Sequence, residues 1–203
     1  MPVRVIHSRP GRFAGFVALL AALALPSQGA AQAAQPPGME FRALAGGFFP
    51  GGDLKSSVAS AGLFAGQLAY GFWDRFSLLA SVSANETYGN HTRFLVARRV
   101  NVYQYDLGIE RRLTSLKTGS WDQVLTLGVG MGGRAYDQKA AGVTSTNSSM
   151  YGSFGLGLTK AEQPWGIRVE LRANRSGWRG LLNDQAKTTV GDFGLVAGVT
   201  WRP

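Results

Sequence analysis

Five charged residues fall in two short stretches of the chain, at spacings that can build an ionic cluster. Asp106 and Glu110 lie four positions apart, while Arg168, Glu170 and Arg172 lie two apart. Side chains at even spacings along a β-strand point to the same face of the sheet. Acids on one strand can therefore pair with bases on another. We predict that these five residues form a cluster of ion pairs in the interior of the folded protein, with a structural role.

Nucleophilic or metal-based catalysis has little support in the sequence. Apart from His7, which lies in an N-terminal segment described below as an export signal, His91 is the one histidine. The chain has no cysteine. A histidine beside a serine or glutamate can activate a nucleophile, but Thr92 and Arg93 follow His91. Zinc sites draw mainly on cysteine and histidine. We interpret His91 as a surface-loop residue, and we predict no catalytic residue and no bound metal.

A glycine-rich run from Gly128 to Gly133, GVGMGG, matches the letters of the dinucleotide-binding pattern G-x-G-x-x-G. That site requires a helix to start at the glycines, so that its N-terminus meets a phosphate. Here Arg134 to Tyr136 and a polar segment follow instead. We interpret these glycines as residues on the interior face of a crowded barrel, and we predict no cofactor.

The elements that position the charges are β-strands, because apolar and polar residues alternate with a period of two. One face of each segment carries large apolar residues, and the other carries small or polar residues and the five charges. A less regular first strand would add Glu40 and Arg42 to the charged set. Eight strands are predicted, at about 39–50, 63–73, 76–83, 103–110, 125–132, 150–159, 165–174 and 193–201.

The connections between these strands alternate between long and short, beginning with a long one. This order is typical of an up-and-down membrane barrel with its N-terminus in the periplasm, where outer loops are long and inner turns short. Aromatic residues near strand ends would sit at the level of lipid headgroups. The long segments are 51–61, 84–98, 137–148 and 175–189; the short ones are 73–75, 113–120 and 160–164; the aromatic residues are Phe48, Phe49, Phe72, Trp73, Phe76, Trp121, Tyr136, Trp165 and Trp201.

The two faces also indicate which side of the barrel points outward. A soluble lipocalin-like barrel keeps its apolar face inside, whereas a barrel in lipid turns that face outward, because polar groups in hydrocarbon are costly. The charges on the other face can pair across a narrow interior. A gated polar path is the alternative interpretation of that cluster. We favour interior ion pairs, because side chains fill a barrel of eight strands.

The first part of the chain has the three-part pattern of a secretory signal peptide. Residues 1–12 are basic, residues 13–25 are continuously apolar, and an A-x-A site follows at Ala31 to Ala33. We predict cleavage near Ala33, a short linker at 34–38 and a barrel domain at 39–203. The formal net charge of +9 falls to +6 after cleavage. The basic residues are scattered, so we predict no binding to nucleic acid.

Three segments, FRALAGGFFP, GLFAGQLAYGFWDRFSLLASVS and GDFGLVAGVTWRP, resemble those of small eight-stranded outer-membrane barrels, typified by the OmpA membrane domain and OmpX. The resemblance covers 39–203. It implies location in the cell outer membrane, contact with outer-membrane lipids and lipopolysaccharide, delivery by the barrel-assembly machinery, and a monomer. Such chains usually end on an aromatic residue that acts as an assembly signal, whereas Arg202 and Pro203 follow Trp201 here.

The sequence therefore predicts an all-β, eight-stranded antiparallel up-and-down transmembrane barrel after a signal peptide. Its expected function is a non-enzymatic structural or surface-interaction role without a water-filled pore. One alternative is an outer-membrane enzyme that modifies lipid A, although the His–Ser spacing of the lipases it would resemble is absent around His91. A second alternative is a secreted lipocalin-like binding barrel.

Overall fold

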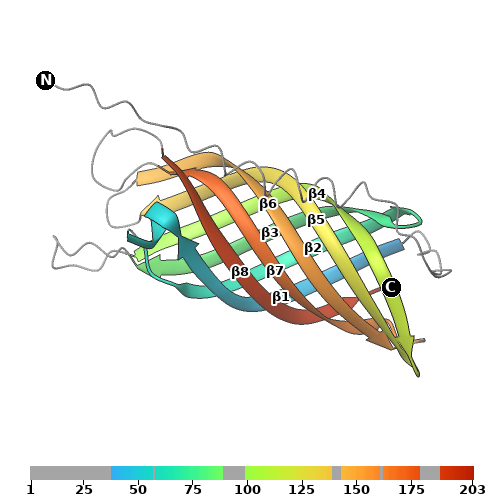
Figure 1. Ribbon diagram of the computed structural model, residues 1–203. Coiled ribbons are helices and arrows are strands. Elements are labelled where there is room, and N and C mark those ends of the chain that lie inside the picture. The colour runs from blue at the N-terminus through green and yellow to red at the C-terminus, as the bar shows by residue number, and fades with distance from the viewer. Residues whose placement is uncertain (1–37, 57, 89–98, 139–142, 161, 179–187) are drawn as a thin grey trace, which may run out of the picture.

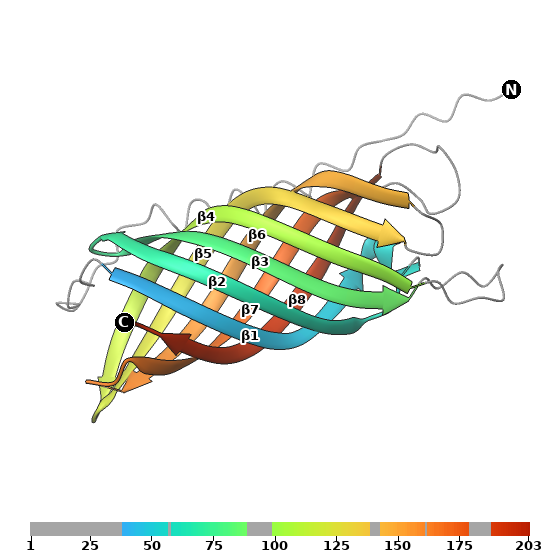
Figure 2. The same ribbon diagram turned by 180° about the vertical axis from the view of Figure 1, so that it is seen from behind.

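The computed structural model describes residues 38–56, 58–88, 99–138, 143–160, 162–178 and 188–203. They form eight antiparallel strands that close into one barrel, in which each strand pairs with its neighbours in the chain and β8 pairs with β1 (Figures 1 and 2). The strands are β1 (Gly38–Gly51), β2 (Ala61–Trp73), β3 (Phe76–Tyr88), β4 (Arg99–Thr118), β5 (Trp121–Gln138), β6 (Val143–Lys160), β7 (Trp165–Trp178) and β8 (Thr188–Trp201).

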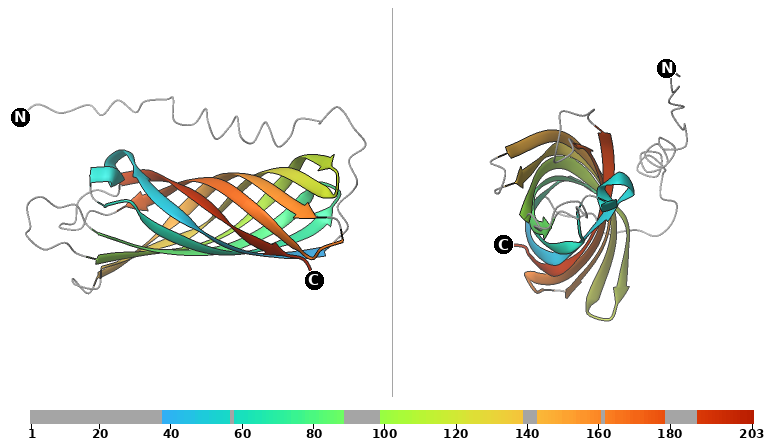
Figure 3. Two further views of the ribbon diagram at one scale, coloured as in Figure 1. Left: turned by 90° about the horizontal axis from the view of Figure 1, so that it is seen from below. Right: turned by 90° about the vertical axis from the view of Figure 1, so that its left-hand side faces the viewer.

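The two ends of the barrel differ. The short connections after β2, β4 and β6 lie at the end that carries the C-terminus, which we call the turn end. The opposite end, the loop end, carries the short 3-10 helix η2 (Gly52–Ser56) between β1 and β2 (Figure 3, left). Viewed along its axis, the barrel is a closed ring of strands (Figure 3, right). Among the described residues, no helix is long and apolar enough to cross a membrane.

Alternation within each strand separates an apolar exterior from a polar interior, as predicted. Leu78 and Leu79 illustrate it: adjacent in β3, they expose 52% and 1% of their surface. The exterior belt contains leucine, valine, methionine and aromatic side chains from all eight strands, and the interior contains the five predicted charged residues. The apolar faces predicted from the sequence are the outer faces.

Several strands run longer than the alternation predicted. Residues 113–118 belong to β4 rather than to a connection, and only Gly119 and Ser120 form the turn to β5. A bulge between Arg112 and Thr114 interrupts the pairing, which hides the period of two in the sequence. Gly119 has a φ of +61°, a conformation that glycine adopts without strain. The β4–β5 hairpin therefore extends past the other strands at the turn end (Figure 1).

Two of the nine predicted interfacial aromatics point inward instead. Phe48 in β1 and Tyr136 in β5 occupy interior positions and are buried. Four tryptophans do lie on the exterior at the turn end, namely Trp73, Trp121, Trp165 and Trp201. The rings of Trp165 and Trp201 lie 6.0 Å apart, and Phe41 lies 5.5 Å from Trp201.

Candidate functional site

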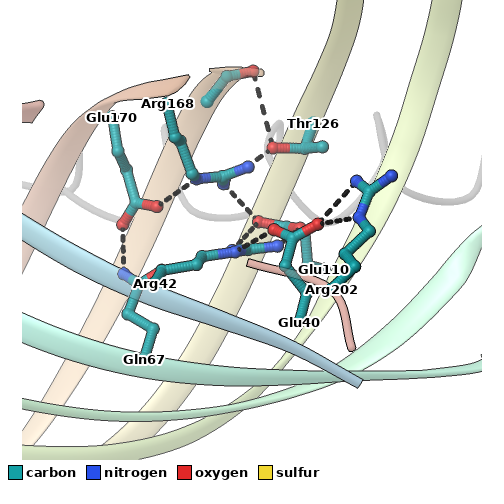
Figure 4. Close-up of polar contacts among 9 residues, drawn as sticks. Glu40, Arg42, Gln67, Glu110, Thr126, Arg168, Glu170 and Arg202 are labelled. Atoms are coloured by element: carbon teal, nitrogen blue, oxygen red, sulfur yellow. Dashed lines mark hydrogen bonds and ion pairs between the residues drawn. The ribbon is translucent and has the colours of Figure 1, made fainter. Parts of the chain in front are cut away.

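The turn-end half of the interior holds a hydrogen-bonded ionic network, which we call the turn-end network (Figure 4). At its centre, Arg42 from β1 makes a bidentate ion pair with Glu110 from β4, with nitrogen–oxygen distances of 2.7 and 3.0 Å. The Nε of Arg42 also donates to Glu40 at 2.6 Å. The network consists of Glu40, Arg42, Gln67, Glu110, Thr126, Arg168, Glu170 and Arg202.

Arg168 on β7 joins the carboxylate of Glu110 to that of Glu170. Its guanidinium contacts Glu110 directly, and its Nε donates to Glu170 at 3.1 Å. Gln67 links Glu170 back to Arg42, because its amide nitrogen donates to Glu170 at 3.0 Å and its amide oxygen accepts from Arg42 at 3.2 Å. The charged groups at the centre of this network are thus paired from opposite walls of the barrel.

A second network, the loop-end network, lies nearer the loop end. Arg172 on β7 donates to Asp106 on β4 at 2.5 Å and to Ser81 at 3.0 Å. Arg134 on β5 pairs with Asp192 on β8 and donates to Gln104 at 2.8 Å. The network consists of Ser81, Gln104, Asp106, Arg134, Ser149, Arg172, Asn174 and Asp192.

A small apolar layer lies between the two networks. Tyr151, Ala69 and Leu79 form a buried cluster. A methyl group on Gly108 would collide with the Tyr151 hydroxyl, and one on Gly130 would collide with the Tyr151 ring. Gly108 stands between Asp106 and Glu110 on β4, so Tyr151 lies at the level that divides the networks. The guanidinium of Arg172 stacks on this ring at 3.7 Å from its centre. Among the described residues, the observed hydrogen bonds of each network stay within it.

The structure thus brings the five predicted charged residues inside the barrel, but into two networks rather than one. Asp106 and Arg172 belong to the loop-end network, while Glu110, Arg168 and Glu170 belong to the turn-end network. Sequence analysis missed Arg134, Asp192 and Arg202. Arg134 and Asp192 lie just outside the predicted strands at 125–132 and 193–201, so the sequence assigned them to no strand face. In the structure β5 and β8 extend over them, and both side chains are buried in the interior.

The interior leaves little free space. Two cavities of about 20 Å³ each were found. One lies against the turn-end network, and the other is lined by residues of both networks, Glu170 and Arg172 among them. A water molecule needs about 10–15 Å³, so each cavity accommodates about one water. In the part of the chain that the structure describes, no group of three or more histidine, aspartate or glutamate residues is arranged to hold a metal ion. The described interior is therefore filled, by the two ionic networks and by a cluster of buried apolar side chains at the loop end.

No protein-family model matches the chain, and no curated protein matches its sequence. Solved structures do match the fold. Neisserial surface protein A is 14% identical, with a TM-score of 0.56 over 81% of this chain and 97% of that protein. The outer membrane protein OprG from Pseudomonas aeruginosa is 12% identical, with a TM-score of 0.52 over 85% and 98%. The chain has the fold of the small outer-membrane β-barrels.

The exterior of this outer-membrane barrel agrees with that fold. Closed barrels leave no unpaired strand edge, and an apolar belt of this kind is stable against hydrocarbon. The exterior tryptophans at the turn end match the aromatic girdle that such barrels place at the membrane surface. The barrel therefore has the exterior expected of a protein that spans a lipid membrane.

The two residues that follow the last aromatic of this outer-membrane barrel have a defined place in the structure. Arg202 donates through its backbone N–H to the Pro164 carbonyl at 2.8 Å. Its guanidinium donates to Glu40 at 2.5 and 2.6 Å. Arg202 thereby caps the turn-end network and places a cation at the turn end of the barrel.

Predictions that fall on the other segments are not tested by the structure. His91, the export signal with its cleavage near Ala33, and most of the linker at 34–38 lie outside the described residues. The glycines at 128, 130 and 132 lie within β5 and not at the start of a helix. Gly128 adjoins Ser153 and Gly130 adjoins Tyr151, which agrees with the interpretation of glycines on a crowded wall.

Proposed function

We propose that this protein is a non-enzymatic outer-membrane barrel that serves envelope integrity or surface interaction and has no water-filled pore. The observation that carries the proposal is the pair of ionic networks separated by the Tyr151 layer. An ion crossing the barrel would have to break Arg42–Glu110 and Arg168–Glu110 at one level and Arg172–Asp106 at another. Breaking a buried pair leaves an uncompensated charge, which is costly.

The lipid partners follow from the exterior. Outer-membrane phospholipids and lipopolysaccharide acyl chains would contact the apolar belt, and the net positive charge of the chain suits anionic headgroups. Orientation follows from loop length: the loop end would face the outside and the turn end the periplasm. We expect a monomer that is inserted by the barrel-assembly machinery.

Two alternative functions have weaker support. A lipid A-modifying enzyme would need His91, whose surroundings the structure does not describe. A secreted lipocalin-like binder would need the apolar face to line the interior, whereas the large apolar residues of the described strands lie mainly outside.

The proposal is tested by fractionation and conductance. We expect the protein in the outer-membrane fraction, migrating differently on gels before and after heating. In planar bilayers the folded protein should give no steady ion conductance, since both networks stay closed. The heat-unfolded protein provides the control for contaminating channels. Recovery as a soluble periplasmic protein would refute the membrane assignment, and a reproducible open conductance would refute the sealed interior alone.

A further inference from the structure

The β4–β5 hairpin leaves part of β4 without a neighbouring strand at the turn end (Figures 1 and 2). Pairing between β3 and β4 stops at Phe76 and Arg111, whereas pairing between β4 and β5 continues to Thr118 and Trp121. Residues 114–118 thus lie beyond the start of β3, and we call them the β4 overhang. In the part of the chain that the structure describes, no strand pairs with the overhang on the β3 side. The overhang is an open sheet edge.

The backbone of the β4 overhang is held extended by the strands on its other side. Lys117 of the overhang pairs with Asp122 on β5, and Trp121 of β5 pairs with Lys160 on β6. The overhang is therefore the edge of a three-stranded sheet rather than a loose tip. Its N–H and C=O groups on the open side keep the regular spacing of a sheet ladder. An edge of this kind is a template on which another strand can pair.

The side chains of the β4 overhang alternate between two faces of different character. On one face Leu116 lies between Thr114 and Thr118 and exposes 58% of its surface. On the other face Lys117 is exposed, and it is the one charged residue of the overhang. Opposite charges on neighbouring strands attract, and apolar and β-branched side chains pack across strands. A strand added on the open side would therefore fit best with an acid beside Lys117 and apolar residues beside Leu116.

A second copy of this chain does not fit the open edge. Two copies inserted the same way into one membrane are related by an axis along the membrane normal, and the strands of such barrels tilt by about 35–45° from that direction. The two β4 strands would cross at about 70–90°. Neighbouring strands in a sheet differ in direction by only about 20–25°. The partner must therefore be a strand whose direction the membrane does not fix.

We propose that the β4 overhang binds an extended segment of another polypeptide by strand addition, and that this segment alternates apolar or β-branched residues with acidic ones. Main-chain hydrogen bonds along the open edge supply the attraction, while Leu116 and Lys117 select the side chains. The inference goes beyond the proposed function and takes from it only the orientation. With the turn end toward the periplasm, the partner is a segment of a periplasmic protein.

A capped peptide of alternating valine and glutamate is a suitable probe. It would be titrated into the barrel held as single copies in phosphatidylcholine nanodiscs, with backbone amide exchange followed by NMR. We expect fast exchange on the open side of 114–118 without peptide, and saturable slowing at alternate amides with it. Leu107, which already pairs with Ala80 on β3, should not change. Both barrel ends are open to solution in a nanodisc, so this result is independent of orientation and of the conductance test.

Two further peptides and two variants separate backbone pairing from charge. A valine–lysine peptide should bind about fivefold more weakly than the valine–glutamate peptide. Lys117→Glu should reverse this preference. Lys160→Glu is the matched control, because it changes the same charge at the same end of the barrel but on β6, away from the edge, and it should leave the preference in place. A valine–glutamate peptide methylated on every backbone nitrogen should not bind.

Three results would overturn the proposal of strand addition. Slow exchange at 114–118 without peptide would mean that the edge is already closed. No saturable slowing with the valine–glutamate peptide would mean that the edge accepts no strand. Equal binding of the methylated peptide would mean that the attraction does not come from main-chain hydrogen bonds. A preference for glutamate that persists in Lys117→Glu would overturn the selection of acidic partners.

Discussion

Replacing Glu110 by glutamine is expected to lower the free energy of unfolding by about 3–5 kcal/mol, the range for breaking a buried ion pair from one side. Glu110 is the carboxylate that both Arg42 and Arg168 contact. The uncharged amide leaves two buried guanidinium groups facing each other with one counter-charge fewer. The measurement is urea unfolding from lipid vesicles, followed by tryptophan fluorescence.

Glu86→Gln provides the matched control, because it removes the same charge from an exposed pair. Glu86 lies 3.4 Å from Arg99, and the two side chains are 49% and 68% exposed. Exposed pairs contribute about 0–1 kcal/mol, so this variant should unfold nearly as the wild type does. Equal losses in the two variants would mean that Glu110 is solvated, and the account of a closed turn-end network would be wrong.

Replacing Gly198 by alanine is expected to destabilise the barrel by about 3 kcal/mol, at the upper end for overpacking. Gly198 on β8 pairs with Leu44 on β1, where the first and last strands meet. A methyl group at this position would collide with the Ala43 carbonyl and lie 2.8 Å from the Leu44 Cα. These atoms are backbone, so the closing strand pair itself must shift.

The effect of Gly198→Ala should appear as a smaller fraction of folded, heat-modifiable protein under fixed refolding conditions, and as a lower unfolding midpoint. Gly62→Ala is the control, because nothing lies within 4 Å of the position that its methyl group would take. If both variants fold equally well, the closure of β1 against β8 tolerates more separation than this structure shows.

The exterior and interior faces could be predicted from the sequence because they depend only on the period of two. Each alternating segment has one large apolar face, and lipid requires that face outside. The pairing of individual charges could not be predicted in this way. Which acid meets which base depends on the stagger between strands that closes the barrel, and alternation carries no information about stagger. Asp106 and Glu110 therefore looked like one cluster, although the Tyr151 layer divides them.

The buried apolar cluster at the loop end, which includes Phe48, Leu54, Val58 and Tyr136, was hidden for a related reason. Phe48 and Tyr136 looked like interfacial aromatics because they lie near strand ends, and only the register shows that their positions face inward. Leu54 and Val58 lie in a polar connection that the sequence assigned to a loop. Their burial depends on the packing of η2 over the loop end, a tertiary contact between parts of the chain that local periodicity cannot predict.

The central claim is that the apolar side of the sheet contacts hydrocarbon while the ionic side is enclosed. Leu78 and Leu79, which are adjacent in β3, test this claim because one lies on the exterior face and the other on the interior face. In bilayers containing a lipid with a nitroxide on its acyl chain, we predict strong paramagnetic broadening of the Leu78 methyl signals and little effect on those of Leu79. Equal broadening of both residues, or stronger broadening at Leu79, would contradict the account.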